Sequence, residues 1–424
     1  MLRRILVGVG AAIASIVAWA ALVLAASLQG WFASSIAPRG DARAFMDSLV
    51  ERVSAAHVGN VAVALIEDGR VFDRHYRTVG DPVDAQTLFQ MASVSKWVTS
   101  WGVMALVEQG RIDLDAPVSK YVTRWTLPPG RYDNDGVTVR RLLSHTAGLT
   151  DGLGYRGFAP GEMPQTLEES LTFATDRMPG ADGHVRVGRA PGSRWQYSGG
   201  GFTLLQLMIE EVTQQGFAQY MEQTVLEPLG MERTTFDEDV ATVRGIATSY
   251  GSDLQPATHY RFTALAAASM YSDLDDMTRF VLAHVAGDDG APAGRGVLKP
   301  ATLETMRMPE AHVFGRDLWG LGTMLFAASG AEHVFGHDGD NFPAINHAVR
   351  VDPVSRGGFV VLSSGDNAFA SQLAAEWTFW KTGHVDFAGF ARNLQRVLRT
   401  IAIGAGMIAF AALAWIWIGR RRAA

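Results

Sequence analysis

The sequence contains no cysteine and very little lysine. Of its 37 basic side chains only four are lysines, at Lys96, Lys120, Lys299 and Lys381. Without cysteine the chain forms no disulfide, and it offers no thiolate for zinc, for an iron–sulfur cluster or for nucleophilic catalysis. No His-Glu-x-x-His pattern or carboxylate cluster indicates a metal, so we expect neither a metal nor a cofactor.

The chain also lacks the positive charge that nucleic-acid binding requires. Its net charge is −6, whereas phosphate recognition needs a basic face. The mean hydropathy of +0.07 is high for a protein of 424 residues, and the apolar excess lies at the two ends. We therefore expect a membrane as a partner and no nucleic acid.

Two apolar runs are long enough to cross a bilayer as helices. The first is Ile5–Leu28, preceded by Arg3 and Arg4, and the second is Thr400–Gly419, followed by three arginines at 420–422. Basic residues at the outer end of each run predict that both termini are cytoplasmic. The sequence thus predicts an inner-membrane protein with an N-terminal anchor or signal at 1–28, a transmembrane helix at 400–419, and the intervening chain in the periplasm.

The first run has an alternative interpretation as a cleaved signal peptide. Ala18-Trp19-Ala20 and Ala25-Ala26-Ser27 resemble processing sites. The apolar run is longer than the roughly 7–15 residues of a signal core, which favours a retained anchor. Both interpretations export the middle of the chain.

The order of predicted elements between the two runs is typical of an α+β fold. Residues 61–77 predict a hairpin that turns at Asp68-Gly69, and Val94–Gln109 and Phe202–Val212 have helical spacing. Short apolar or alternating runs, followed by a helix, come later, at Leu318–Phe326, His333–Gly336, Ile345–Val351, Gly358–Ser363 and Phe369–Lys381. We expect an antiparallel sheet completed by both ends of one domain, residues 36–390, with flanking helices and a helical lobe.

One lysine is placed for chemistry. Lys96 follows Ser93 by three residues at the start of a predicted helix, which puts both side chains on one face. A desolvated, neutral lysine there accepts the serine proton, and the helix N-terminus favours developing negative charge. Ser-x-x-Lys by itself also fits a helix start with a solvated lysine, so its context decides.

The context resembles a known superfamily. The segment 87–96, Thr-Leu-Phe-Gln-Met-Ala-Ser-Val-Ser-Lys, is similar to the nucleophile segment of the serine β-lactamases and penicillin-binding proteins, in particular the class C β-lactamase, esterase and D-aminopeptidase branch. Further similar segments follow in the family's order at 142–149, 191–198, 228–231 and 335–339. The resemblance spans most of residues 45–380, and it implies a β-lactamase/transpeptidase-like fold.

The resemblance implies three catalytic residues. Ser93 corresponds to the acylated nucleophile and Lys96 to its activating partner. Tyr197 corresponds to the tyrosine that carries protons to the leaving group and later from the attacking water. Which residue is the general base stays open at the level of sequence.

It also implies the substrate-binding strand. His337 and Asp338 stand where the family has the lysine and hydroxyl residue of its third motif, and Gly339 lets substrate lie along the strand. The N–H groups of Asp340 and Ser93 would form the oxyanion hole.

Two other matches to family motifs are set aside. Tyr132-Asp133-Asn134 spells Tyr-x-Asn but lies in a polar turn before the 142–149 segment. Lys381-Thr382-Gly383 spells the third motif but reads as a helix that ends in lysine and glycine. We also expect His145, within 142–149, to be a buried structural residue.

The departures from the family bear on substrate. Gly199 replaces the asparagine of Tyr-x-Asn, and an acidic Asp338 would repel a substrate carboxylate. We therefore expect an ester, a lactone, or an amide or peptide whose amino end meets Asp338. The main prediction is a membrane-anchored periplasmic serine hydrolase. The alternatives are a β-lactamase, D,D-carboxypeptidase or D-aminopeptidase, and a non-hydrolytic module that is acylated without turnover.

Overall fold

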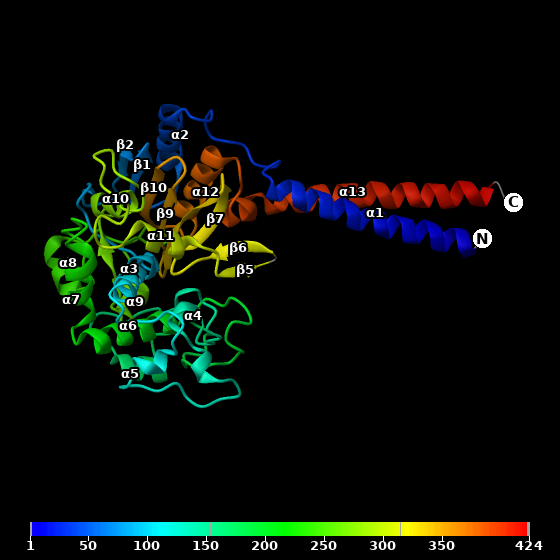
Figure 1. Cartoon of the computed structure of the whole chain (residues 1–424). Coiled ribbons are helices and arrows are strands. Elements are labelled where there is room, and N and C mark those ends of the chain that lie inside the picture. Colours follow the sequence, from blue (N-terminus) through cyan, green and yellow to red (C-terminus); the bar gives the residue numbers. More distant parts are fainter. Residues whose placement is uncertain (1, 153, 314, 422–424) are drawn as a thin grey trace. The chain divides into compact units, whose positions relative to one another are not determined.

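The structure, a computed structural model, describes residues 2–152, 154–313 and 315–421 (Figure 1). Contacts divide the chain into two compact units. One unit is Ala42–Ala374, and the other combines residues 1–41 with residues 375–424. Each unit is described by itself below.

An antiparallel sheet of eight strands forms the centre of the unit Ala42–Ala374. Its strand order is β2-β1-β10-β9-β8-β7-β6-β5. The strands are β1 (Val61–Glu67), β2 (Arg70–Arg77), β5 (Ala311–Val313), β6 (Arg316–Trp319), β7 (Met324–Ser329), β8 (Glu332–Asn341), β9 (Ile345–Asp352) and β10 (Gly357–Ser364). A separate pair joins β3 (Phe89–Gln90) to β4 (Tyr271–Ser272).

The expected hairpin and sheet closure are confirmed. Asp68 and Gly69 both have positive φ, 50° and 77°, as the favoured two-residue hairpin turn requires. Strand β1 pairs with β10, with Val61 opposite Ser363, so the two ends of the unit complete one sheet.

The prediction of one strand over Leu318–Phe326 is wrong. The run is divided between β6 and β7 by a tight turn at residues 320–323, in which Gly322 has a φ of 76°. Apolar patterning does not distinguish one strand from two short ones when the turn itself contains leucine. The short strand β5 was not predicted, because three residues, Ala311-His312-Val313, are too few to establish an alternating pattern.

Helices cover the sheet and build the helical lobe, which we define as residues 111–263. The helices of this unit, with the α12 helix that crosses its boundary, are α2 (Ala42–Ala55), α3 (Val94–Glu108), α4 (Val139–Leu143), α5 (Leu167–Thr172), α6 (Gly199–Thr213), α7 (Phe217–Met221), α8 (Glu238–Arg244), α9 (Leu265–Ala268), α10 (Leu274–Leu282), α11 (Pro300–Arg307) and α12 (Phe369–Thr382). Single turns η1 (Val118–Lys120) and η2 (Asn134–Gly136) and the wider turn η3 (Glu222–Leu226) complete the set.

Helix α3 is the buried axis of this unit. It contacts β8 and β9 of the sheet on one side and α6, α7 and α9 on the other (Figure 1). Its residues from Val94 to Leu106 are all buried, including the polar Lys96. A helix that is buried on all sides in this way is typical of a protein interior.

The second unit contains two long apolar helices that lie side by side (Figure 1). Helix α1 (Leu2–Leu28) contains the apolar stretch Ile5–Leu28, and α13 (Phe387–Arg421) contains Asn393–Ile418. By length and composition, both could cross a bilayer.

Helix α13 begins 13 residues before the predicted start at Thr400. Asp386 caps it, since its carboxylate accepts the Gly389 N–H at 2.8 Å. Arg422, part of the predicted basic flank, lies outside the described residues.

Candidate active site

The nucleophile candidate Ser93 lies on a strained turn in front of α3. The preceding residue, Ala92, has a φ of 46°, a conformation that costs energy for any residue other than glycine. The turn is fixed from behind, because the Gln90 carbonyl accepts a hydrogen bond from His347 Nε2 at 2.9 Å. In the described part of the chain the Ser93 N–H has no acceptor, as an oxyanion donor requires.

Lys96 lies one turn along the same face of α3. Its Nζ is 3.2 Å from Ser93 Oγ and donates to the Ala267 carbonyl at 2.6 Å. The side chain is 2% exposed, and this burial lowers the pKa of Lys96 to about 7, against a smaller opposing effect of the Asp151 carboxylate. Near neutral pH a substantial fraction of this amine is unprotonated and able to accept a proton.

Tyr197 approaches Ser93 from the helical lobe. Its hydroxyl donates to Ser93 Oγ at 2.9 Å, and Lys96 Nζ lies 5.0 Å from its ring centroid. Burial raises the pKa of Tyr197 well above its usual value, so the phenol stays protonated. The tyrosine is thus suited to donating a proton rather than starting as the base.

His145 is buried, as expected, and supports Tyr197. The two ring centroids are 4.4 Å apart, and His145 Nδ1 accepts the Ser198 N–H at 3.2 Å. Burial lowers the pKa of His145 far below its usual value, so the ring is neutral. These contacts confirm the structural interpretation of this histidine.

Strand β8 passes directly beside the nucleophile turn. A Cβ on Gly339 would lie 2.5 Å from the Met91 carbonyl oxygen, so only glycine allows this approach. Strand β7 pairs with β8 only as far as Gly336, and in the described structure residues 337–341 pair with β9 alone. Their other edge is open to an extended ligand.

Asp340 follows Gly339 on this open edge. Its side chain reaches solvent, and among the described residues it has no ion-pair partner. Partial burial and the Asp338 carboxylate together raise the pKa of Asp340 to about 6, which leaves the group mainly ionised at pH 7. The carboxylate acts on Tyr197, whose pKa it raises further.

His337 does not replace the cation of the family motif. It is 1% exposed, its Nδ1 donates to the Asp338 carbonyl at 2.6 Å, and burial lowers its pKa to about 3. The imidazole is therefore neutral and offers no charge to a substrate carboxylate.

The expected role of Asp338 is corrected by the structure. Its carboxylate forms an ion pair with the fully buried Arg350 guanidinium, which stacks 3.3 Å from the Phe326 ring centroid. Because Arg350 neutralises it, Asp338 is not a free charge that repels a carboxylate or attracts an amine.

The place of the missing asparagine is filled by an aromatic ring. A Cβ on Gly199 would lie 2.9 Å from the Tyr155 ring, and the Tyr155 hydroxyl is hydrogen-bonded to Thr203 Oγ1 at 2.8 Å. Gly199 itself has no side-chain amide to hold an acylamino group.

The two set-aside motifs lie elsewhere. Tyr132 stacks under Arg131 before the turn η2, while Tyr197 holds the bond to Ser93. Lys381 lies in the last turn of α12, and Gly383 ends that helix with a φ of 76°.

Two residues at the site were missed from the sequence. Ala267 contributes only its backbone carbonyl, which no side-chain pattern reveals. Asp151 accepts from Ser198 Oγ at 2.5 Å and from the Gly200 N–H at 2.9 Å. Its position just after the 142–149 segment was the one available signal.

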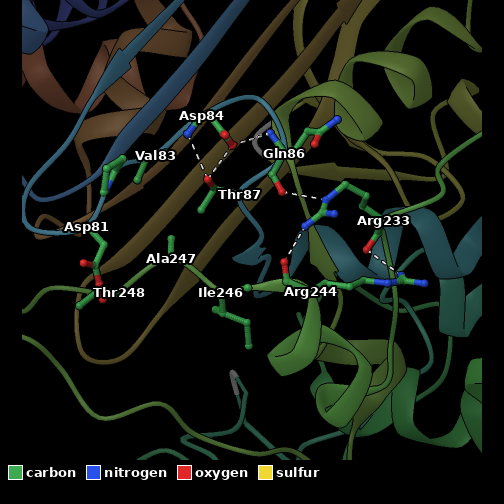
Figure 2. Close-up of a pocket in the computed structure, with 12 residues that line it drawn as sticks. Asp81, Val83, Asp84, Gln86, Thr87, Arg233, Arg244, Ile246, Ala247 and Thr248 are labelled. Atoms are coloured by element: carbon green, nitrogen blue, oxygen red, sulfur yellow. Dashed lines mark hydrogen bonds between the residues drawn. The ribbon is translucent and has the colours of Figure 1, made fainter.

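Two cavities in this unit are lined by none of these residues. Figure 2 shows one of about 300 Å³, beside Asp84, Arg233 and Arg244. Arg233 donates there to the Gln86 and Arg244 carbonyls, so its guanidinium connects two segments that line the cavity. A cavity of about 660 Å³ in the helical lobe is lined by Trp125 and residues 184–188, among others. The described residues hold no cluster of three or more possible metal ligands.

Comparison with known proteins identifies the family. The family model described as Beta-lactamase matches residues 43–378. The chain belongs to the Beta-lactamase family. The resemblance found in the motifs is thereby confirmed.

Several known proteins resemble the chain along most of its length. Protein flp of Staphylococcus aureus (strain NCTC 8325 / PS 47) is 22% identical over 404 residues, covering 88% of this chain and 75% of that protein. The octameric penicillin-binding protein homologue from Pyrococcus abyssi superposes with a TM-score of 0.65 at 24% identity, over 84% of this chain and 82% of that chain. The D-amino acid amidase from Ochrobactrum anthropi SV3 gives a TM-score of 0.58 at 22% identity, over 84% and 98%. These structural likenesses confirm the fold.

Proposed function

We propose that the protein is a serine hydrolase that cleaves an ester or amide through an acyl-enzyme on Ser93. The observation that carries this proposal is the convergence of Lys96 Nζ and the Tyr197 hydroxyl on Ser93 Oγ, at 3.2 Å and 2.9 Å. A hydroxyl with a base and a proton donor in reach, beside an open strand edge, is suited to acyl transfer.

Acylation follows from these contacts. Neutral Lys96 takes the proton of Ser93 Oγ as the oxygen bonds to the substrate carbonyl carbon, and the carbonyl oxygen becomes an oxyanion. The N–H groups of Ser93 and Asp340 hold that oxyanion. When the bond to the leaving group breaks, Tyr197 gives the leaving group a proton and regains one from Lys96.

Deacylation reverses the proton path. A water molecule loses a proton toward Tyr197 and Lys96 as its oxygen attacks the acyl carbon. Collapse of the second tetrahedral intermediate releases the acid and returns the proton to Ser93 Oγ. No metal or cofactor takes part in this scheme.

The substrate we propose has no carboxylate beside the third motif. His337 is neutral and supplies no cation there, and the buried Arg350 guanidinium is already paired with Asp338. The ionised group left on the open edge is the Asp340 carboxylate, which favours neutral or cationic groups over anionic ones. This argues for esters and amides over penicillins and D-Ala-D-Ala peptides.

A second candidate is a D-amino acid amidase. It is supported by the likeness to solved structures titled as a D-amino acid amidase and as a D-stereospecific amidohydrolase from Streptomyces sp.. Asp340 gives the free amino group of such an amide a carboxylate to meet.

We further propose that α1 and α13 anchor a catalytic domain of residues 36–390 to the inner membrane on its periplasmic side. The two helices are fitted to each other. Trp19 Nε1 donates to the Thr400 carbonyl at 3.2 Å, and Gly404 leaves room for the Trp19 indole. A segment with a specific helical partner argues for a retained anchor rather than a cleaved signal.

The catalytic proposal is tested by a substrate panel with the purified, detergent-solubilised chain. We expect turnover of p-nitrophenyl acetate or D-phenylalanine amide to exceed that of benzylpenicillin, and Ser93→Ala to abolish it. Faster hydrolysis of the penicillin would instead support the β-lactamase alternative. A burst of one product equivalent without steady turnover would support the non-hydrolytic alternative.

The anchoring proposal has its own test. After alkaline carbonate extraction of membranes, we expect the protein in the pellet with residues 1–28 present in its intact mass. A carbonate-soluble protein would contradict the anchor, and a mass lacking those residues would support the cleaved signal.

A further inference from the structure

A buried carboxylate outside the predicted catalytic set connects the two groups that act on Ser93. Asp151 lies in the helical lobe with 8% exposure, at the N-terminus of the 15-residue helix α6. Its Oδ1 accepts from Ser198 Oγ at 2.5 Å and its Oδ2 from the Gly200 N–H at 2.9 Å. Burial raises the pKa of Asp151, while the hydrogen bonds from Ser198 Oγ and the Gly200 N–H oppose that effect and favour the ionised carboxylate.

The first connection runs to Tyr197 through the neighbouring residue. Ser198 is the N-cap of α6, and its Oγ also accepts the Gly201 N–H at 2.9 Å. Its N–H donates to His145 Nδ1. Ser198 is therefore held at three points, and the backbone that carries the Tyr197 hydroxyl to Ser93 is held with it.

The second connection is electrostatic and runs to Lys96. Asp151 is the carboxylate whose charge acts on this amine and favours its protonated form. The other titratable groups around Lys96 are His145, His337 and Tyr197, and burial keeps all three uncharged. The effect of Asp151 is smaller than that of burial and opposes it.

We propose that Asp151 is a positioning residue for the acyl transfer, which holds Tyr197 through Ser198 and sets the pH at which Lys96 becomes the base. The proposal rests on the proposed function, and it assigns Asp151 two separable effects. Its hydrogen bonds fix the geometry of the proton donor, and its charge sets the protonation of the amine.

Two variants separate the effects. Asp151→Asn keeps the side-chain shape but removes the charge and one acceptor oxygen. Ser198→Ala removes the hydrogen bond to Asp151 but leaves the charge and its bond to Gly200 in place. The readout is kcat/KM from pH 5 to pH 10 for an alkyl ester, whose leaving group needs a proton from Tyr197, with the full chain in detergent.

We expect Asp151→Asn to move the acidic limb of the profile to lower pH by about one unit, because Lys96 loses the charge that favours its protonation. We expect both variants to lower the plateau about tenfold or more, because Tyr197 loses its support. For Ser198→Ala we expect the acidic limb of the kcat/KM profile to have the same midpoint pH as in the wild type.

Asp176→Asn is the matched control. Asp176 is also buried in the helical lobe, with 6% exposure, and burial raises its pKa to about 6. Its charge acts on Tyr155 and not on Lys96. We expect the limb in this variant to coincide with that of the wild type.

An unmoved limb in a folded Asp151→Asn protein, or an unchanged plateau in Ser198→Ala, would overturn the assignment. If Asp151→Asn does not fold, the plateau of Ser198→Ala decides. Failure of the proposed function is distinguishable, because the wild type itself would then give no turnover that depends on Ser93.

Discussion

Nζ of Lys96 lies 3.2 Å from Oγ of Ser93, and its second contact is a backbone carbonyl, that of Ala267. The carbonyl accepts a hydrogen bond from the amine but does not neutralise its charge. Burial therefore dominates, and the pKa of Lys96 falls to about 7. A residue that is normally cationic thus becomes a base near neutral pH.

The pH profile is the first consequence. The unprotonated amine is the active form, and its fraction grows as the pH rises through the lowered pKa. We expect kcat/KM for p-nitrophenyl acetate to rise through about pH 7. Tyr197 gives no falling limb in the measurable range, because its pKa is raised.

Lys96→Arg is the control. The guanidinium stays protonated, so we expect kcat/KM to fall by about 10²-fold to 10⁴-fold at every pH. Full activity of Lys96→Arg would exclude the lysine as the base.

Tyr197→Phe separates proton donation from nucleophilic attack. The phenol remains protonated, so we assign it to the leaving group. We expect the variant to lose about 10²-fold to 10⁴-fold on an amide or alkyl ester, whose leaving groups need a proton. The loss on p-nitrophenyl acetate will be smaller, since p-nitrophenolate leaves unprotonated. If kcat falls equally for the p-nitrophenyl ester and for the amide or alkyl ester, Tyr197 is not the proton donor to the leaving group.

Asp340→Asn tests the charge of the open strand edge. We compare p-nitrophenyl esters whose acyl chains end in trimethylammonium, methyl or carboxylate groups. The wild type will prefer the cationic ester to the anionic one, and the variant will reduce that ratio about tenfold, which corresponds to about 1.4 kcal/mol. Added salt will reduce the ratio in the wild type as well. If Asp340→Asn leaves the ratio of cationic to anionic ester hydrolysis unchanged, Asp340 does not select the substrate.

Gly339→Ala tests the approach of β8 to the nucleophile turn. The new methyl group would lie 2.5 Å from the Met91 carbonyl oxygen, so the strand must shift. We expect a loss of about 1–3 kcal/mol in stability and a lower kcat. Gly216→Ala is the matched control, with ordinary φ and nothing within 4 Å of the added Cβ, and its stability will stay within about 0.5 kcal/mol of wild type. Thermal unfolding in detergent measures both. Equal thermal stability of the two variants would show that β8 is not tightly packed here.

Local pattern predicted the elements that form the sheet and the central helix. The hairpin at Asp68-Gly69 and the helix after Ser93 each have a turn or a period that their own residues determine. The division of 318–326 into β6 and β7 depends on a turn whose residues look like strand. The early start of α13 depends on the cap at Asp386. That cap lies well before the uncharged run from which the helix was predicted.

The site was predictable where side chains carry the chemistry and not where distant partners decide. Ser93, Lys96 and Tyr197 lie together as the motifs indicated. Asp338 on β8 and Arg350 on β9 form an ion pair because the register of the two strands brings them together. That register cannot be deduced from the sequence alone. Asp151 acts through Ser198, across 47 residues of chain, so its role follows only from the fold.

The most direct test of the central claim is the identity of the acylated residue. The full chain is treated with a fluorophosphonate probe or quenched during turnover of p-nitrophenyl acetate, digested, and analysed by tandem mass spectrometry. We predict the adduct on Ser93, its absence in Ser93→Ala, and slower labelling in Lys96→Arg. An adduct on another residue, or undiminished ester hydrolysis by Ser93→Ala, would contradict the account.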